Sequence, residues 1–325
     1  MDGFYDSVDI HRLMLRDDVR NRAYRDAIYA TVKPGDVVLD VGAGTGILSL
    51  LAAQAGASRV FAVERANIAR LATEIIARNN VADRIMVLQG DIVHMRLPQK
   101  VDIIVSEWLG TFGVDENLLA PVLVARDRWL KPGGKMLPQM VTAWMAPVWN
   151  SELEFDLNLR RGRVYGLDLQ LVAEPTVQEV TWARRAVTDA DFIAMPQSMW
   201  VTDVYRYETE QARLPFRASL TFTPVRAGKI NALTAWFTAE FGAGISLTNA
   251  PGAPATHWGQ YLFPLRETVE VTHETPIAVT FSCMPVAPGY CAQAWSIQVG
   301  ERPWEHHDSR GSRRSKLPMA VAGTD

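Results

Sequence analysis

Apolar residues between positions 36 and 137 occur in short runs that alternate with amphipathic segments. The segments "RANIARLATEIIARNN" at 65–80 and residues from about Glu116 to Leu130 have helical spacing, and "KPGG" at 131–134 is expected to stop the second helix. The apolar runs, which have the length of buried strands, are "DVVLDVG" at 36–42, "SRVFAVE" at 58–64, "RIMVLQGD" at 84–91 and "VDIIVSE" at 101–107. This alternation predicts βαβ units, and therefore a parallel sheet with helices on both faces.

The segments on either side of this region have different patterns. Apolar residues between Ile10 and Ala30 recur at spacings that suit one amphipathic helix or two. After Pro138, segments such as "IAVTFSCMPV" alternate apolar and polar residues, which is typical of half-buried strands. We therefore predict four parts: N-terminal helices at 1–34, a parallel α/β domain at 35–138, a β domain at 139–305 and a flexible, polar tail at 306–325.

Composition excludes several classes of protein. The 325 residues are 48% apolar and 21% charged, with a formal net charge of −3, which gives no basic surface for nucleic acid. The chain has two cysteines, Cys283 and Cys291, too few for a disulfide framework or a four-thiolate zinc site. No signal peptide and no run of 18 apolar residues is present. We expect a cytoplasmic protein that binds neither membrane nor nucleic acid.

The segment "LDVGAGTG" places Gly42, Gly44 and Gly46 between a strand and a helix. Glycines there let the backbone approach a bound nucleotide, although a plain tight turn would need them too. Glu64 ends the next strand, where an acid bonds ribose hydroxyls in dinucleotide and S-adenosylmethionine sites. The G-x-G-x-G spacing, and Asp40 near the expected cofactor ammonium, favour S-adenosylmethionine. Asp91 of "GD" is a predicted acceptor for the adenine amino group.

The stretch "SEWLGTFGVDENLL" at 106–119 sets Glu107 and Glu116 nine residues apart. On a helix they would point to opposite sides, so we predict a loop in which Gly110 and Gly113 let the chain fold back. Two carboxylates in one pocket repel unless a cation joins them, and a planar guanidinium suits this better than lysine. Mg²⁺ is the rival cation, but no further ligands accompany the pair, so we predict no metal. Alternatively, Glu116 only caps the following helix.

These motifs resemble those of the protein arginine methyltransferases. "VLDVGAGTGIL" is similar to their cofactor motif, "SEW" with Glu116 to their double-glutamate loop, and "THW" at 256–258 to their barrel-loop motif. "IHRLMLRDDVR" resembles the N-terminal helix that closes over the cofactor, and "VYGLD" and "ARDRWLKPGG" are weaker matches. The resemblance, to a compact member of bacterial type, implies a Rossmann-like class I methyltransferase domain, then a β-barrel whose arm, about residues 150–175, forms a head-to-tail homodimer.

The resemblance also implies roles for individual residues. Glu107 and Glu116 would clamp the arginine side chain, and Arg20 would pair with the methionyl carboxylate. Asp17 and His257 would form a charged pair that fixes the N-terminal helix and accepts the departing proton. The predicted substrate contacts are Met14, Glu107, Glu116 and Trp258; those to S-adenosylmethionine, whose product is S-adenosylhomocysteine, are Arg20, Asp40, Gly42, Gly44, Thr45, Gly46, Glu64, Asp91 and Ile92.

The sequence leaves the acceptor open. Thr111 stands where the family has an aromatic residue, and Val93 where it has an acid for the adenine. These departures from the family pattern leave both free L-arginine and protein arginine as substrates. A transferase of the same fold acting on another acceptor, and an inactive S-adenosylmethionine-binding scaffold, are the alternative hypotheses.

Overall fold

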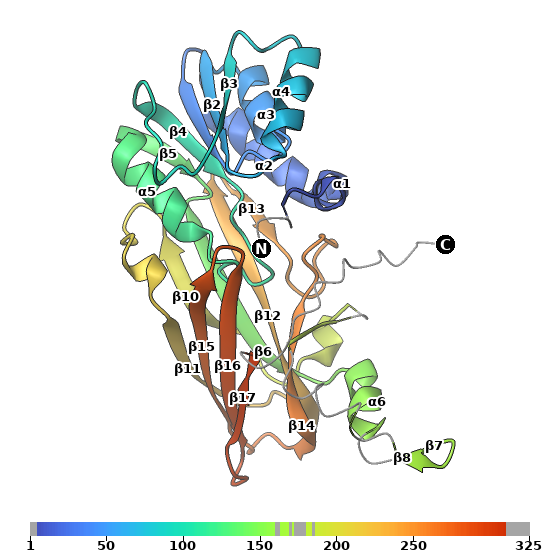
Figure 1. The fold of residues 1–325 in the computed structure, drawn as a ribbon. Helices are drawn as coiled ribbons and strands as arrows, with labels where there is room; N and C mark the ends of the chain where they lie inside the picture. The colour runs from blue at the N-terminus through green and yellow to red at the C-terminus, as the bar shows by residue number, and fades with distance from the viewer. Residues whose placement is uncertain (1–4, 160–162, 169–170, 172–179, 184–185, 310–325) are drawn as a thin grey trace.

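The computed structural model describes residues 5–159, 163–168, 171, 180–183 and 186–309. A parallel-sheet domain lies at one end of the molecule and a larger antiparallel β domain, which begins at residue 139, at the other (Figure 1). Of the predicted arm at 150–175 and tail at 306–325, the parts beyond these ranges lie outside the described residues. No helix among the described residues is long and apolar enough to cross a membrane.

Two helices precede the parallel sheet, α1 (Val8–Arg16) and α2 (Asp18–Thr31). The Ser7 side chain accepts a hydrogen bond from the Asp9 backbone N–H and so caps α1. Asp17 stands between the helices, and its Oδ1 accepts the Arg20 backbone N–H at 2.9 Å, which caps α2. The N-terminal segment therefore forms two helices, within the prediction of one or two, and Asp17 marks the break between them.

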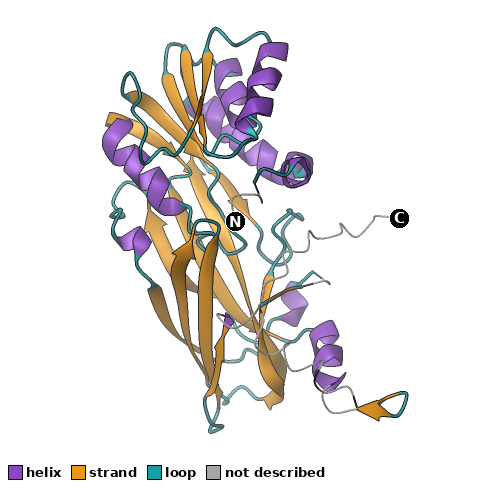
Figure 2. Ribbon diagram, viewed as in Figure 1, coloured by secondary structure: helices purple, strands orange, loops and turns teal. Residues whose placement is uncertain are grey.

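The parallel sheet has the strand order β3-β2-β1-β4-β5. Its elements in chain order are β1 (Val37–Val41), α3 (Ile47–Gln54), β2 (Arg59–Glu64), α4 (Ala69–Arg78), β3 (Ile85–Gln89), β4 (Val101–Ser106), α5 (Leu119–Trp129) and β5 (Leu130–Leu137). Helices α3 and α4 cover one face and α5 the other (Figures 1 and 2). The order reverses between β1 and β4, where Val41 pairs with Ser106, so the chain that follows each strand emerges at the switch point, the usual ligand site of such sheets.

The sheet differs from the prediction at its last element. "KPGG" does not only stop the helix, because residues 131–134 lie within β5, which pairs parallel with β4. Pro132 is tolerated there because β5 is an edge strand, where a missing N–H costs no ladder bond. Helix α5 itself begins at Leu119, three residues after the predicted Glu116.

The described residues of the β domain form two large antiparallel sheets and a two-stranded antiparallel sheet, β7-β8. The first has the order β10-β6-β12-β14-β9, with β13 paired to β12, and the second has the order β11-β15-β16-β17. The strands are β6 (Met140–Val148), β7 (Arg163–Val164), β8 (Leu167–Asp168), β9 (Thr181–Trp182), β10 (Gln197–Asp203), β11 (Phe216–Phe222), β12 (Gly228–Gly242), β13 (Ile245–Thr248), β14 (Tyr261–Val271), β15 (Ile277–Ala287), β16 (Tyr290–Val299) and β17 (Glu305–Asp308). Helix α6 (Ser151–Leu159) and two 3₁₀ turns, η2 (Asp189–Asp191) and η3 (Gln211–Arg213), complete the domain.

The two sheets face one another across an aromatic core. Phe263 of β14 lies 5.2 Å from Phe281 of β15 and 5.3 Å from Trp295 of β16, measured between ring centroids. The prediction of an antiparallel β domain is thus confirmed, and its two large sheets have separate hydrogen-bonded ladders in the described residues.

The prediction that the flexible tail starts at His306 is wrong. Residues 305–308 form β17, which pairs with β16, and the His307 ring stacks on Trp295 with centroids 4.9 Å apart. His307 is buried by this stacking. The polar string "EHHD" is held by strand pairing, by this ring contact and by side-chain bonds such as that of His306 Nδ1 to Ser296 Oγ at 2.8 Å, so its sequence carries little apolar signal.

Candidate functional site

The glycine turn, residues 42–46, follows β1 at the switch point. Gly42, Gly44 and Gly46 all have positive φ, at +76°, +56° and +83°, which side chains rarely adopt. A Cβ on Gly44 would lie 3.0 Å from Cε1 of His11, so α1 closely covers this turn. The Gly44 backbone N–H donates to Glu64 Oε2 at 2.9 Å. The structure therefore brings Glu64 to the glycine turn, as the sequence predicts.

Asp40, in β1 beneath this turn, is fully buried. Its Oδ2 accepts the Ser49 hydroxyl at 2.7 Å, while Oδ1 has no hydrogen-bond partner within the described part of the chain. Burial raises the pKa of Asp40 to about 7, and the nearby charge of Glu64 adds to the rise. The site thus holds a carboxyl group with an open acceptor, which a cation would stabilise in its charged form.

The remaining predicted cofactor residues lie near the same sheet edge but differ in exposure. Thr45 and Ile92 are buried, whereas Asp91 is exposed. Asp91 Oδ1 accepts the Val93 backbone N–H at 2.9 Å, so its side chain closes its own turn. A contact between Asp91 and the adenine stays a prediction.

Glu107 leaves β4 beside the glycine turn and is held at both oxygens. Arg20 of α2 donates to its Oε2 from Nε at 3.2 Å and from Nη2 at 3.0 Å, and the Leu109 backbone N–H donates to its Oε1 at 2.9 Å. The two side chains are 6% and 8% exposed. The pair is therefore a buried, charge-assisted contact, and Arg20 already supplies a cation that relieves repulsion at this carboxylate.

The chain after Glu107 folds back in a narrow hairpin. Gly110 and Gly113 exchange backbone hydrogen bonds, each 3.1 Å long, and Gly113 has a φ of +92°. Asp115 Oδ1 accepts the Phe112 backbone N–H at 3.0 Å and closes the turn. A Cβ on Gly110 would lie 2.7 Å from Asp115 Cγ, so no larger residue fits. The predicted role of both glycines is confirmed, and we call residues 107–117 the acid loop.

Glu116 lies at the end of the acid loop and accepts a hydrogen bond from the Tyr5 hydroxyl at Oε2. Burial first, and then the charges of Glu116, Glu107 and Asp115, raise the pKa of Tyr5 well above 10.0. Glu116 therefore contacts the phenol directly, and the charge of Glu107 also acts on it. The alternative that Glu116 caps α5 is wrong, because α5 has Leu118 as its N-cap and no side-chain cap. Tyr5 was not predicted; its signal is an aromatic residue just before α1.

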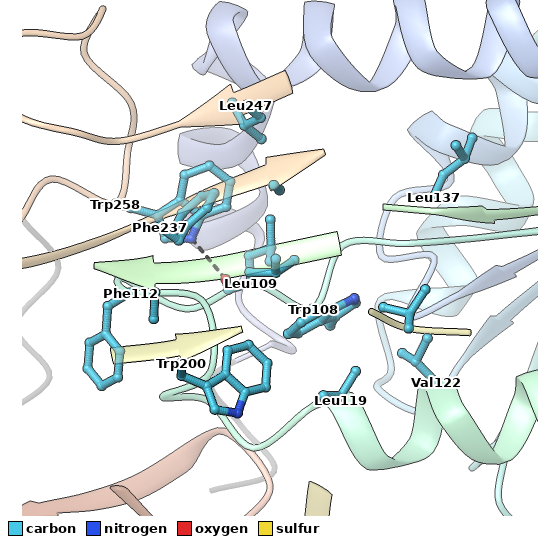
Figure 3. Packing of buried hydrophobic residues seen from close by; sticks show 14 of the residues in the cluster. Trp108, Leu109, Phe112, Leu119, Val122, Leu137, Trp200, Phe237, Leu247 and Trp258 are labelled. Atoms are coloured by element: carbon cyan, nitrogen blue, oxygen red, sulfur yellow. Dashed lines mark hydrogen bonds between the residues drawn. The ribbon is translucent and has the colours of Figure 1, made fainter. Parts of the chain in front are cut away.

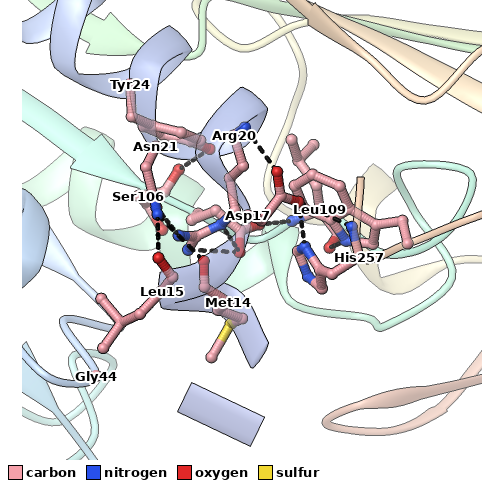
Figure 4. Close-up of polar contacts among 12 residues, drawn as sticks. Met14, Leu15, Asp17, Arg20, Asn21, Tyr24, Gly44, Ser106, Leu109 and His257 are labelled. Carbon is pink, nitrogen blue, oxygen red and sulfur yellow. Dashed lines mark hydrogen bonds and ion pairs between the residues drawn. The ribbon is translucent and has the colours of Figure 1, made fainter. Parts of the chain in front are cut away.

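Asp17 and His257 form the predicted pair between the N-terminal helices and the β domain. Asp17 Oδ2 accepts hydrogen bonds from the His257 backbone N–H at 2.9 Å and contacts Nδ1 of the ring at 2.7 Å (Figure 4). Burial alone raises the pKa of Asp17, but the hydrogen bonds from His257 and Arg20 outweigh it and lower that pKa below 3.8. Asp17 is therefore a carboxylate that connects α1, α2 and the loop that carries His257. Its part in proton transfer stays a prediction.

The residues predicted to contact the substrate have different surroundings. Trp258 is 5% exposed, and its indole N–H donates to the Leu109 carbonyl oxygen at 2.9 Å (Figure 3). The ring is therefore buried and bonded to the acid loop, and its contact with the substrate stays a prediction. Met14, at the end of α1, is half-buried, and its backbone oxygen accepts Asn21 Nδ2 at 3.3 Å.

The β domain also holds the acid loop through its backbone. At the β15–β16 turn, the Gly289 N–H donates to the Glu116 carbonyl oxygen at 2.7 Å and the Cys291 N–H donates to that of Asp115 at 2.9 Å. The position of Glu116 is thus set by the β domain as well as by the parallel sheet. Sequence reasoning missed these contacts, because backbone donors leave no motif.

Comparison with protein families gives two matches. The model described as arginine methyltransferase oligomerization subdomain matches residues 140–294, and that of ribosomal protein L11 methyltransferase matches residues 26–124. Protein arginine N-methyltransferase 1 of Chlamydomonas reinhardtii is 36% identical over 301 residues, 88% of this chain and 84% of that protein. Protein arginine N-methyltransferase 6 of Danio rerio is 36% identical over 292 residues, 86% and 83% of the two chains.

Solved structures are similar over nearly the whole chain. Arabidopsis thaliana protein arginine methyltransferase 10 superposes with a TM-score of 0.82 at 26% identity, covering 95% of this chain and 98% of that one. The Trypanosoma brucei PRMT1 enzyme–prozyme heterotetrameric complex with AdoHcy gives a TM-score of 0.82 at 29% identity, with 94% and 98% covered. The similarity therefore spans both the parallel-sheet domain and the β domain.

Proposed function

Because this chain belongs to the protein arginine N-methyltransferase family, and is therefore an S-adenosylmethionine-dependent arginine N-methyltransferase, we propose that it methylates arginine side chains of proteins, held by Glu107 and Glu116. One observation carries the assignment of the two glutamates. The Gly110–Gly113 hairpin turns the chain back next to the carboxyl ends of β1 and β4, where Arg20 bonds Glu107 and the Tyr5 hydroxyl bonds Glu116. The names of the relatives support a protein substrate over free arginine.

The site fits S-adenosylmethionine on its own residues. The orphaned Oδ1 of Asp40 lacks the cation that the cofactor's ammonium would bring, and Gly42 has no heavy atom within 4 Å of where a Cβ would be. Glu64 lies at the glycine turn, with lone pairs left for ribose hydroxyls. Arg20 is the cation for the methionyl carboxylate. When bound, the cofactor would supply a methyl group on a sulfonium, the substrate would supply the nucleophilic nitrogen, and the chain would position the two and hold the charge.

The two carboxylates would activate the acceptor by holding its charge. A guanidinium has a pKa above 12 and a delocalised charge, so none of its nitrogens is a good nucleophile. Glu107 and Glu116, fixed at hydrogen-bond range, would hold the positive charge on two nitrogens and leave the third with a more localised lone pair. Glu107 cannot rotate, because Arg20 and the Leu109 N–H fix its oxygens. Most of the rate enhancement would then come from positioning.

Asp17 and His257 are proposed to receive the proton that the guanidine loses. The Asp17 carboxylate contacts Nδ1 of the ring at 2.7 Å and so would stabilise an imidazolium. The same pair fixes α2, which carries Arg20, so loss of either residue would affect both the proton and the cofactor. This shared dependence explains why the pair joins two parts of the chain that are 240 residues apart.

The acceptor is tested directly by product analysis. The purified chain is incubated with methyl-labelled S-adenosylmethionine and, separately, an arginine-containing peptide, the same peptide with lysine for arginine, and free L-arginine. We expect label on an ω-nitrogen of the arginine peptide alone, identified by mass spectrometry. Label on free L-arginine but not on the peptide would replace the protein substrate with a small molecule. Label on no guanidine would contradict the proposal and favour the inactive scaffold.

We further propose that two copies associate head to tail through the arm. Helix α6 buries Leu153 and Leu157 against the β domain but leaves Phe155 66% exposed. Beyond it, Tyr165 and Leu167 are 98% and 62% exposed, and the β7–β8 hairpin projects from the body of the molecule (Figure 1). Apolar side chains at such exposure favour burial against a partner. The match of residues 140–294 to an oligomerization subdomain supports the same proposal.

A further inference from the structure

Two loops from different domains must keep a fixed separation for the proposed reaction. The acid loop carries the carboxylates, and residues 256–260, which we call the histidine loop, carry His257. Asn249 belongs to neither loop. It follows β13 directly and is 2% exposed. No motif or family feature singled it out in the sequence.

The Asn249 side chain bonds to both loops at once. Its Nδ2 donates to the Thr111 carbonyl oxygen of the acid loop at 2.7 Å and to the Gly259 carbonyl oxygen of the histidine loop at 2.6 Å. Its Oδ1 accepts the Phe237 backbone N–H of β12 at 2.9 Å. Both N–H donors of the amide and its oxygen are thus engaged, which is the full donor capacity of an asparagine.

We propose that Asn249 is a positioning residue that sets the distance between the acid loop and the histidine loop. A carboxamide is planar, and its two N–H groups diverge at a fixed angle, so two carbonyl oxygens bonded to it are held at a fixed separation. The bond of Oδ1 to β12 fixes the amide to the β domain, so both loops are positioned relative to that domain. The bond from Trp258 to Leu109 is a second link between the same loops (Figure 3). The inference rests on the proposed function, since it assigns both loops to one reaction.

The test is the substitution Asn249→Asp, which keeps the shape of the side chain and the acceptor for Phe237. It replaces both donors by an oxygen that faces two carbonyl oxygens. We expect kcat for the arginine peptide to fall by about 10- to 100-fold, because small misplacements of reacting groups have effects of that size. The dissociation constant of S-adenosylmethionine should stay within about threefold, because Asn249 contacts none of the glycine turn.

A second measurement does not depend on activity. Backbone amide hydrogen exchange, followed by mass spectrometry, should become faster in both the acid loop and the histidine loop of the Asn249→Asp variant. Because both loops are bonded to one amide, they should lose protection together. Faster exchange in only one loop would overturn the inference.

Asn231→Asp is the matched control. Asn231 lies in β12, the strand to which the Asn249 amide is bonded, is fully buried, and bonds the backbone N–H and carbonyl oxygen of Asn150 at 2.9 and 2.8 Å. The same chemical change there should lower stability but leave both loops protected. The variants are compared with the wild type in the same oligomeric state. If kcat of the Asn249→Asp variant equals that of Asn231→Asp, the inference is wrong.

Two further outcomes keep the test decisive. Should Asn249→Asp fail to fold, Asn249→Ala removes the same donors without adding charge, and the same joint loss of loop protection is expected. A wild-type chain that methylates no guanidine would overturn the proposed function alone, and the exchange measurement would still decide whether Asn249 links the two loops.

Discussion

The two glutamates that are proposed to hold the guanidinium have different partners in the structure. Glu107 is fixed by a buried guanidinium and a backbone N–H, whereas Glu116 accepts from a phenol whose raised pKa keeps it a donor at neutral pH. Glu107 is therefore the rigid member of the pair. Glu116 is the member whose present partner a substrate would have to displace.

Replacing Glu116 by glutamine should lower kcat by about 10²- to 10³-fold, because the amide keeps the shape but removes the charge that opposes the guanidinium. Affinity for S-adenosylmethionine should stay near the wild-type value, since Glu116 contacts Tyr5 rather than the glycine turn. Single-turnover assays and equilibrium titration measure the two quantities separately. Glu107→Gln should lower kcat as much and also weaken cofactor binding, because it frees Arg20. Equal cofactor affinities in both variants would contradict this division of roles.

Asp40 predicts a pH dependence of stability for the chain without cofactor. Its pKa is raised by burial from 3.8 to about 7, so the folded state binds the proton more tightly than the unfolded state between these values. The contribution of Asp40 to the free energy of unfolding therefore falls as pH rises from about 4 to about 7. In urea unfolding, Asp40→Asn should gain stability relative to the wild type over that range, by up to about 4 kcal/mol. A difference independent of pH would show that Asp40 is ionised throughout.

Residues were predictable from sequence where their chemistry is distinctive. The pair of acids, the glycine turn and Glu64 have few other uses at those positions, so each was found where the structure places it. Tyr5 and Asn249 were missed, because a tyrosine or an asparagine acquires its role only from what the tertiary fold places beside it. Trp258 was found from its motif, but its bond to the Leu109 carbonyl oxygen was not predicted, since that bond depends on how the β domain packs against the acid loop.

Among the elements, the acid-loop hairpin depends most on sequence detail. Gly110→Ala would place a Cβ 2.7 Å from Asp115 Cγ and 2.9 Å from Glu116 Cγ, so the turn must open. We expect kcat to fall by about 10- to 100-fold through displacement of Glu116. Gly133→Ala is the control, because its φ of +77° gives backbone strain while no atom lies within 4 Å of the new Cβ. Equal loss of activity in the two variants, measured at equal folded fraction, would rule out the hairpin as the cause.

Elements with a clear period were predicted well, and those without one were not. Helices α1 and α2 and strands β1 to β4 follow their apolar patterns. Strand β5 was missed because "KPGG" is typical of a turn, whereas the residues on either side of it, Leu130 and Lys135, both pair with β4. Strand β17 was missed because pairing with β16 and the stack of His307 on Trp295 replace apolar alternation. In both cases the neighbour, not the segment, decides the conformation.

At the scale of the whole molecule, the exposed arm predicts the oligomeric state. The double variant Phe155→Glu, Tyr165→Glu puts charges on side chains that are 66% and 98% exposed, so each subunit should still fold. Light scattering coupled to size exclusion should give a dimer for the wild type and a 36.1 kDa monomer for the variant. Met195→Glu, at a residue 69% exposed outside the arm, should leave the mass unchanged. A wild-type monomer, or a variant that remains dimeric, would contradict the arm.

Because the β15–β16 turn bonds the carbonyl oxygens of Asp115 and Glu116, the parallel-sheet domain depends on the β domain for the position of Glu116. A fragment that ended near Pro138 would keep the glycine turn but would lose the two backbone N–H donors that fix Asp115 and Glu116. The same fragment would lack His257, so Asp17 would lose the partner that fixes α2 and Arg20. A design that moves this site to another scaffold must therefore include the β15–β16 turn as well as the acid loop.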